Sequence, residues 1–169
     1  MSVYDTERLN LRRLGTDDEA FMLELVNDPD WLRYIGDRGV RDIADARRYI
    51  SDNIMAMYSR YGFGLFMVEL KQGGVPIGIC GLVKRETLDD VDIGFAFLPA
   101  YRNNGYAREA ARATMAYATE VLHLSRVVAI TTPDNTRSIA LLKELGFAFE
   151  RPIQSMPAGD MLSLFALEL

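Results

Sequence analysis

The residues with the clearest chemical potential lie in one stretch, 99–111, which reads P-A-Y-R-N-N-G-Y-A-R-E-A-A. It follows an apolar, strand-like run at 91–98 and opens a helix-like run at 105–122. The first N–H groups of a helix have no partner inside it, and the helix dipole makes them attractive to anions. Gly105 leaves room for a close ligand, and two nearby arginines add positive charge. The stretch therefore predicts a binding site for a phosphorylated ligand.

Size, charge and cysteine usage restrict the class of protein. The chain has 169 residues, with 19 Lys or Arg against 24 Asp or Glu, for a formal charge of −5. This balance argues against a general nucleic-acid binder, which needs a basic face. No apolar run is long enough for a membrane span or placed to be a signal peptide, and one Cys with one His leaves no disulfide and no Cys/His zinc site. We expect one soluble, cytoplasmic domain over residues 1–169, monomeric or homodimeric, with no metal, membrane or nucleic-acid partner.

Hydrophobic periodicity predicts the elements that must position the loop. Period-two alternation and β-branched runs indicate seven strands, at 7–14, 64–70, 76–84, 91–98, 126–131, 147–153 and 161–167. Apolar residues at three-to-four-residue steps indicate four helices, at 16–27, 42–61, 105–122 and 135–145. In the second helix the expected apolar stripe is Ile43, Ala46, Ile50, Ile54, Met57 and Tyr61. The order β-α-α-β-β-β-α-β-α-β-β predicts an α/β fold, a mixed sheet with helices on its faces.

Several segments in this order resemble one enzyme superfamily. Arg102, Gly105 and Ala107 match [QR]-x-x-G-x-[GA], the signature of the GNAT N-acetyltransferases. The strand D-I-G-F-A-F-L before it, the later N-T-R-S-I-A-L-L-K-E-L-G-F, and the early T-E-R-L-N-L-R-R-L and N-D-P-D-W-L-R-Y-I-G are similar to the GNAT branch that acetylates N-terminal amines of ribosomal proteins. The resemblance covers nearly the whole chain.

This resemblance implies a fold and a co-substrate. The GNAT fold is a mixed, mostly antiparallel sheet of about seven strands with about four flanking helices, splayed between the fourth and fifth strands, here those at 91–98 and 126–131. The implied co-substrate is acetyl-CoA, whose pantetheine arm enters the splay as an extra strand and whose diphosphate binds the loop. The residues expected to hold it are Phe95, Ala96 and Phe97 by their backbone, Arg102, Asn103, Asn104, Gly105, Tyr106, Ala107 and Arg108 in the loop, and Asn135 and Ser138 in the next helix.

The resemblance also implies the chemistry, transfer of an acetyl group to a primary amine of a protein or peptide N-terminus or of a small molecule. Many GNAT enzymes use a tyrosine acid where this chain has Leu142, and in the ribosomal-protein branch a serine takes the role, here Ser138. Asp92 and Asp160 are the candidates for the base, since the connection at 151–159 lacks the acidic residue that this branch often carries. Near pH 7 an α-amine is roughly one-sixth neutral, against about 4 parts in 10,000 for lysine. Weak base machinery therefore favours an acceptor amine of low pKa.

Three aromatic residues are expected to wall the acceptor pocket: Trp31, Tyr34 and Tyr61, all near the first two helices. Core filling is an equally good explanation for them. Likewise a structural role at the helix start is the alternative for Ser138, and a strand-edge or turn position for the two aspartates.

Two rival functions belong to other classes. A catalytically idle acyl-CoA binding or sensing module is consistent with the missing tyrosine and the absence of an obvious base. A nucleotide-phosphate binder would use the same loop, but the chain has neither G-x-x-x-x-G-K-[ST] nor G-x-G-x-x-G.

Overall fold

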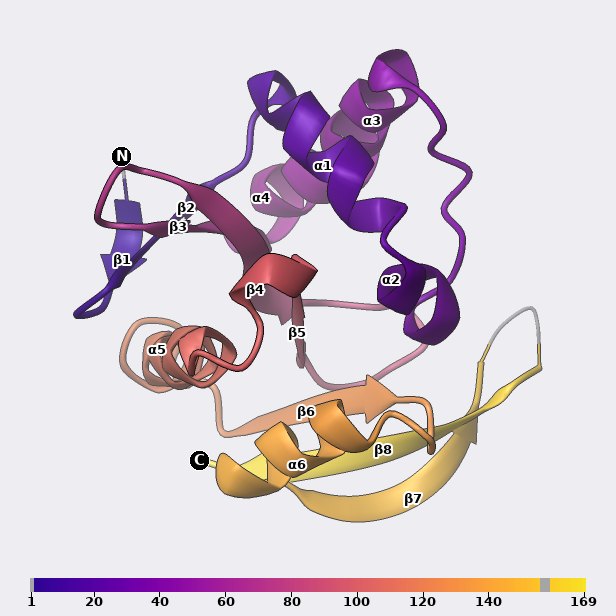
Figure 1. Ribbon diagram of the computed structural model, residues 1–169. Coiled ribbons are helices and arrows are strands. Elements are labelled where there is room, and N and C mark those ends of the chain that lie inside the picture. The colour runs from indigo at the N-terminus through magenta and orange to yellow at the C-terminus, as the bar shows by residue number, and fades with distance from the viewer. Residues whose placement is uncertain (1, 156–158) are drawn as a thin grey trace.

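One eight-stranded sheet organises the protein, and its strands lie in the order β1-β2-β3-β4-β5-β6-β8-β7. The structure is a computed structural model and describes residues 2–155 and 159–169. All neighbouring strands are antiparallel except β5 and β6 (Figure 1). The strands are β1 (Ser2–Asp5), β2 (Leu9–Arg13), β3 (Leu65–Leu70), β4 (Pro76–Val83), β5 (Asp92–Phe97), β6 (Arg126–Thr131), β7 (Ala148–Gln154) and β8 (Met161–Glu168).

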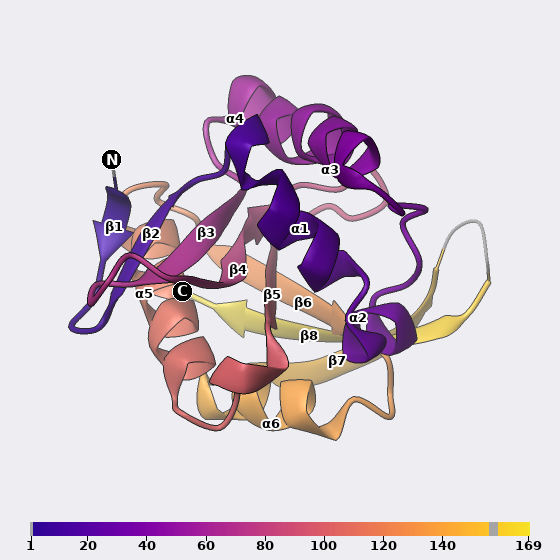
Figure 2. The ribbon, with the colours of Figure 1, turned by 45° about the horizontal axis from the view of Figure 1, so that its top comes forward.

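Helices cover both faces of this sheet. Figures 1 and 2 show α1, α3 and α4 on one side and α5 and α6 on the other. The helices are α1 (Glu19–Val26), α2 (Pro29–Tyr34), α3 (Ile43–Tyr49), α4 (Ala56–Tyr61), α5 (Tyr106–Glu120) and α6 (Thr136–Glu144), and a π-helical segment, Ile50–Met55, joins α3 to α4. Counting α3, the π segment and α4 as one continuous helix gives five helices in the described part of the chain. The α/β class and the GNAT arrangement are therefore as predicted, with one helix and one strand more than expected.

The two additional elements have local causes. β1 pairs with β2 through Tyr4 and Asp5, so the strand predicted at 7–14 is the second of the chain and not the first. The first helix was expected to end at residue 27, and soon after it Pro29 opens α2, where Asp28 caps the helix and accepts the N–H of Asp30 at 3.2 Å. The predicted splay consequently lies between the fifth and sixth strands.

The π segment shifts the buried face of the long helix. A π turn holds about one residue more than an α turn, so the side chains that face the core come at steps of four. Ala46, Ile50, Ile54 and Tyr58 are buried, whereas Ile43 is 41% exposed. The predicted stripe is thus wrong at Ile43, and it omits the buried Tyr58, whereas Met57 and Tyr61 are half-buried. The Tyr58 hydroxyl accepts the Leu14 N–H and donates to the Leu65 carbonyl, which fixes the helix on the sheet.

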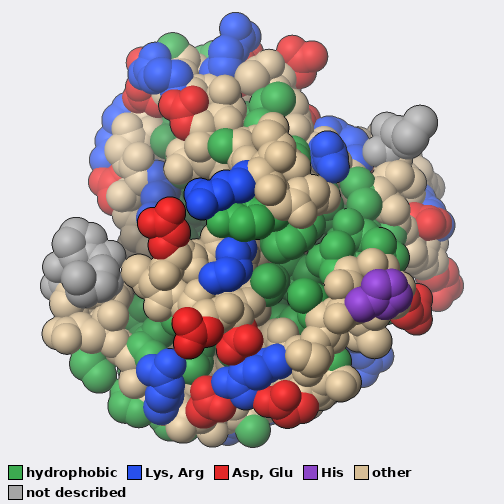
Figure 3. Space-filling model, turned by 180° about the vertical axis from the view of Figure 1, so that it is seen from behind, with side chains coloured by type: hydrophobic (Ala, Val, Ile, Leu, Met, Phe, Trp, Pro, Cys, Tyr) green, Lys and Arg blue, Asp and Glu red, His purple; other side chains and the backbone are tan. Residues whose placement is uncertain are grey.

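The core is centred on β4, whose residues Ile77, Ile79, Cys80 and Leu82 are each at most 2% exposed. Backbone approach is closest at Gly81, where an added Cβ would lie 2.1 Å from the Gly64 carbonyl oxygen. Only glycine fits there, because β3 and β4 would otherwise have to separate. The face turned away in Figure 1 is shown in Figure 3, where basic and acidic side chains are interspersed around apolar ones.

The sheet is nearly divided between β5 and β6. These parallel strands share one bridge, Asp92 with Val128, and the Val128 N–H donates to the Val91 carbonyl at 2.9 Å. Arg126 closes this end by pairing with Asp90 before β5, Glu150 on β7 and Glu168 on β8. Beyond the bridge the two strands separate.

Candidate active site

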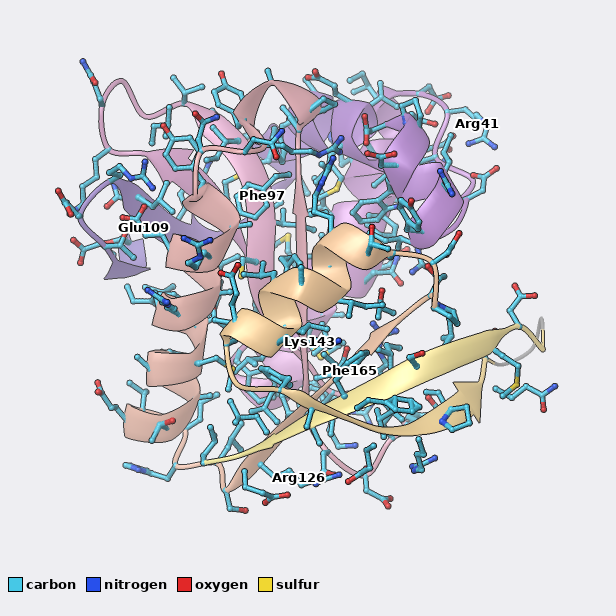
Figure 4. All side chains as sticks on the ribbon, turned by 60° about the horizontal axis from the view of Figure 1, so that its bottom comes forward. Arg41, Phe97, Glu109, Arg126, Lys143 and Phe165 are labelled. Carbon is cyan, nitrogen blue, oxygen red and sulfur yellow. The ribbon has the colours of Figure 1, made fainter. Side chains whose placement is uncertain are left out.

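A cleft of about 1850 Å³ follows the separation of β5 and β6. Its walls come from the two strands, the loop before α5, the first turns of α6, and α2 with the connection after it. Figure 4 shows Phe97 and Glu109 at one end of the molecule, where β5 ends and α5 begins, and Arg126 at the opposite, closed end. The cleft therefore opens toward the N-terminus of α5.

The facing edges of the two strands carry backbone groups that no strand satisfies. In an antiparallel pair, alternate residues turn their backbone groups toward the partner. The Leu98 N–H bonds to the Ile77 carbonyl, so with the register of β4 and β5 the even residues of β5 face β4, and Phe95 and Phe97 face the gap. By the same argument Ile130 faces it from β6, since the Leu169 N–H bonds to the Ser125 carbonyl. An extended ligand with amide groups would complete the sheet here.

Of the three β5 residues predicted to offer their backbone, two are placed to do so. Phe95 and Phe97 present it to the cleft, although the Phe97 carbonyl already accepts the Nε–H of Arg102 at 3.1 Å. Ala96 lines the cleft but pairs with Ile79 of β4, so its N–H and carbonyl point the other way. The expectation for the Ala96 backbone is therefore wrong because of strand register.

The loop before α5 has the geometry of an anion site. Gly105 is its N-cap at φ 80°, and Asn103 also adopts a left-handed φ, 65°. The first helical hydrogen bond runs from the Glu109 N–H to the Gly105 carbonyl, which leaves the N–H groups of Tyr106, Ala107 and Arg108 without helical partners. Asn103, Gly105, Ala107 and Arg108 line the cleft.

Side chains of the same loop also bind neighbouring elements, which the sequence did not indicate. Arg102 donates to Asp28 and Asp30 at 2.7 Å each, so its guanidinium holds α2 against the loop. Arg108 pairs with Glu144 of α6 at 2.6 Å. Asn104 and Tyr106 lie outside the main cleft, where Arg8 donates to the Asn104 carbonyl and stacks over the Tyr106 ring.

The start of α6 forms the facing wall. Asn135 is the N-cap, and its Oδ1 accepts the Ser138 N–H at 3.3 Å. Both residues line the cleft, and Ser138 is half-buried there. Leu142 is 1% exposed and belongs to the core. The backbone N–H of Ser138 thus takes part in capping the helix, which is the structural role given as the alternative. The hydroxyl of Ser138 is not needed for that hydrogen bond.

The two candidate bases have different surroundings. Asp92 lies at the closed end of the split with its side chain only 2% exposed, and its Oδ1 accepts the Arg85 Nε–H at 3.0 Å. Burial raises the pKa of Asp92 to about 6, against the opposing effect of Arg85. Asp160 lines the rim of the cleft and is exposed, just before β8.

The predicted acceptor wall is partly assembled. Trp31, 5% exposed, and Tyr34 line the cleft, and the Trp31 Nε1–H is buried with no hydrogen-bond partner among the residues that the structure describes. Tyr61 is not brought there, because the π segment turns it toward Phe63, with which it stacks at 5.8 Å between ring centroids. Tyr49 takes a place in the cleft instead, and sequence reasoning missed it because only the apolar stripe was sought on that helix.

Two kinds of feature are missing from residues 2–155 and 159–169. No group of three or more His, Cys, Asp and Glu side chains is arranged to hold a metal ion. No helix within these ranges combines the length and the apolar character needed to cross a membrane.

The sequence pattern described as the acetyltransferase (GNAT) domain matches residues 8–148. The chain belongs to the GNAT acetyltransferase family. As such this GNAT protein is an acyltransferase, of a family that uses acetyl-CoA and an amine acceptor. The match includes the loop, both strands of the split and α6.

Relatives of this GNAT acetyltransferase agree with that assignment. The Bacillus subtilis protein named uncharacterized N-acetyltransferase YnaD is 30% identical over 145 residues, which cover 86% of this chain and 82% of YnaD. The crystal structure of a GNAT-family acetyltransferase from Bacillus anthracis is 28% identical with a TM-score of 0.80, covering 97% and 96% of the two chains. RimL, a ribosomal α-N-protein acetyltransferase, is 14% identical with a TM-score of 0.83 over 100% and 94%, and so shares the fold.

Proposed function

We propose that this GNAT acetyltransferase moves the acetyl group of acetyl-CoA to a primary amine of low pKa, such as a peptide or protein N-terminal α-amine or a small-molecule amine. The observation that carries the proposal is the open split between β5 and β6, which runs from free N–H groups at the α5 N-terminus to the buried carboxylate of Asp92. The resemblance to the ribosomal-protein branch supports an α-amine acceptor.

The residues around the split fit acetyl-CoA. The unsatisfied backbone of Phe95, Phe97 and Ile130 suits a ligand arm with two amides, and the N–H groups from Gly105 to Arg108 suit a diphosphate. Asn135 and Ser138 stand on the opposite wall. When bound, acetyl-CoA supplies the activated acetyl thioester, and most of the rate gain would come from alignment with the amine.

Asp92 is the better placed of the two candidate bases. Its carboxylate is buried at the closed end of the split, whereas Asp160 is exposed at the rim. With a pKa of about 6, Asp92 is mostly deprotonated at pH 7. Moving a proton to it costs roughly 2 kcal/mol from an amine of pKa about 7.7 and roughly 6 kcal/mol from a lysine of pKa about 10.4. This difference favours the acceptor of low pKa.

Two groups of the chain would handle the departing and developing charges. The backbone N–H of Phe95 faces the split and is free to donate to a negatively charged oxygen. Ser138 is the residue proposed to return a proton to the leaving thiolate, because its hydroxyl stands on the α6 wall while its N–H is held by Asn135.

A thiol-release assay with acetyl-CoA tests donor and acceptor together. The panel contains peptides with free and blocked N-termini, amino acids, polyamines, aminoglycosides and a lysine side-chain acceptor. We expect release with free α-amines to exceed release with lysine side chains. Faster acetylation of lysine would overturn the acceptor class, and CoA binding without transfer to any amine would select the acyl-CoA sensing module.

Gly105→Ala tests the loop. Alanine at the φ of 80° costs about 1–2 kcal/mol, and the relaxed loop misdirects the N–H groups that would face the diphosphate. We expect the Kd for CoA, measured by calorimetry, to rise about tenfold or more. Gly62→Ala is the matched control, with φ 78° and a place outside the cleft, and it should lose similar stability with no change in CoA affinity. Equal CoA affinity in both folded variants would contradict the loop assignment.

A further inference from the structure

The half of the cleft around Asp92 is lined by cations that the reaction itself does not require. Arg38 comes from the connection after α2, and Lys84 and Arg85 come from the end of β4. Asp92 is the carboxylate among the lining residues there. This gathering of positive charge contrasts with the formal charge of −5 for the whole chain.

These three cations differ in their hydrogen-bond partners. The Lys84 ammonium donates to the carbonyls of Arg85 and Leu88, whereas Arg33, farther along the cleft, is paired with Asp134 at 3.4 Å. Arg85 donates its Nε–H to Asp92, and this hydrogen bond does not involve the two terminal NH₂ groups of its guanidinium. Across residues 2–155 and 159–169, Arg38 forms an ion pair with no carboxylate within 4.0 Å.

Three acidic side chains close to these arginines in sequence pair with other residues. Asp37, next to Arg38 in sequence, pairs with Arg41. Glu86, next to Arg85, lies 3.7 Å from Arg60, and Asp90 is held by Arg126. The protein therefore leaves positive charge in this half of the cleft uncompensated.

Tyr49 connects the two arginines that retain free donors. It is half-buried and lines the cleft, and both Arg38 and Arg85 are close enough to oppose the rise in its pKa that burial causes. All three side chains line the same cleft, and the phenol hydroxyl is itself a hydrogen-bond donor. Such a set of donors binds a carboxylate or a phosphate.

We propose that the acceptor carries a carboxylate, which Arg38 and Arg85 bind together with the Tyr49 hydroxyl while the acceptor amine faces Asp92. The inference rests on the proposed function, since it names the acceptor class for the same cleft. The two oxygens of a carboxylate match the planar arrangement of guanidinium N–H donors. The carboxylate can belong to a free amino acid or to an acidic side chain near a peptide N-terminus. Its attraction would also orient the amine before transfer.

The test compares acceptors that differ only in charge. Acetylation kinetics are measured with the C-terminally amidated peptides Ala-Glu-Gly and Ala-Gln-Gly and with free alanine and alaninamide, with each rate referred to the concentration of neutral amine, which distinguishes the peptide source from the amino-acid source. We expect kcat/KM for at least one acidic member to exceed that of its amide by about tenfold or more, since charged hydrogen bonds contribute to binding. Equal values within both pairs would overturn the proposal.

Arg38→Gln should abolish the discrimination by raising KM for the acidic member about tenfold while leaving the amide unchanged. Arg48→Gln is the control, because Arg48 is an exposed arginine outside the cleft that pairs with Asp45. Discrimination that survives in Arg38→Gln, or is lost equally in Arg48→Gln, would refute the site. Binding of the same four compounds to the CoA-loaded protein by calorimetry provides a second readout. If no amine is acetylated, the proposed function fails, yet tighter binding of the acidic compounds that depends on Arg38 would still support the carboxylate site.

Discussion

The burial of Asp92 in the cleft has a cost in the stability of the fold. Its carboxylate is 2% exposed, and the single Nε–H of Arg85 compensates only part of the lost hydration, so its pKa rises to about 6. A folded-state pKa above the ordinary value of about 3.9 means that the folded chain binds more protons than the unfolded chain between these two values. Stability therefore falls as pH rises from about 4 to about 6, by up to roughly 3 kcal/mol.

Asp92→Asn tests both consequences. Relative to wild type, the variant should gain up to about 3 kcal/mol of unfolding free energy between pH 4 and pH 7, measured by denaturant titration. With an α-amine acceptor, log(kcat/KM) of the wild type should rise with slope two below pH 6, from Asp92 and the amine, and the variant should retain slope one. Asp160→Asn is the control and should keep the wild-type slopes. An unchanged profile in Asp92→Asn would remove Asp92 from the base role.

At the scale of elements, Arg102 joins the two walls of the cleft. The guanidinium, 19% exposed, bridges Asp28 at the N-terminus of α2 and Asp30 within it, and also donates to the Phe97 carbonyl at the end of β5. Helix α2, the last residue of β5 and the loop before α5 are therefore joined by one side chain. The six-residue helix α2 is too short to be stable without such support.

Arg102→Ala should destabilise the protein by roughly 2–4 kcal/mol, because Asp28 is left 8% exposed with no cation. The loss should appear first as faster amide hydrogen exchange in α2. Arg108→Ala, which breaks the half-exposed pair with Glu144, is the comparison and should cost less than about 1 kcal/mol. Adding Asp28→Asn to Arg102→Ala should recover part of the lost stability. If the two arginine variants lost the same unfolding free energy, burial of the ion pair would not determine how much each pair stabilises the protein.

For the whole molecule, the split divides the sheet into a β1–β5 part and a β6–β8 part that meet at one bridge, with Arg126 tying the strands together at the closed end. Cofactor and acceptor would therefore bind between two halves, each held by its own helices. A ligand that hydrogen-bonds both open edges adds the contacts that the apoprotein lacks.

CoA should therefore stabilise the protein unevenly. At a concentration of 100 times its Kd the gain is about 2.7 kcal/mol, visible as a rise in Tm. Beyond this global gain, amide exchange should slow most at Phe95, Phe97 and Ile130, whereas Ala96, whose backbone pairs with β4, serves as the internal control. Uniform slowing over the four amides would contradict insertion between the strands.

Local chemistry was enough to predict much of this protein from its sequence. The strand at 126–131 has the predicted limits, the loop before α5 has the predicted glycine at its left-handed N-cap, and Asn135 caps α6 where the next helix was expected to start. Each depends on neighbours within a few residues, so periodicity, glycine conformation and capping decide it. The superfamily signature added the position of the split.

Only the tertiary structure decided which distant residues meet. The π segment turned Tyr61 away from the cleft, strand register turned the Ala96 backbone toward β4, and Arg102 was drawn to Asp28 and Asp30. The grouping of Arg38, Tyr49 and Arg85 likewise joins the connection after α2, the end of α3 and the end of β4. No local pattern encodes such a group, because its members are set by how the elements pack, and the positive charge left unpaired by that packing is the basis of the proposed carboxylate site.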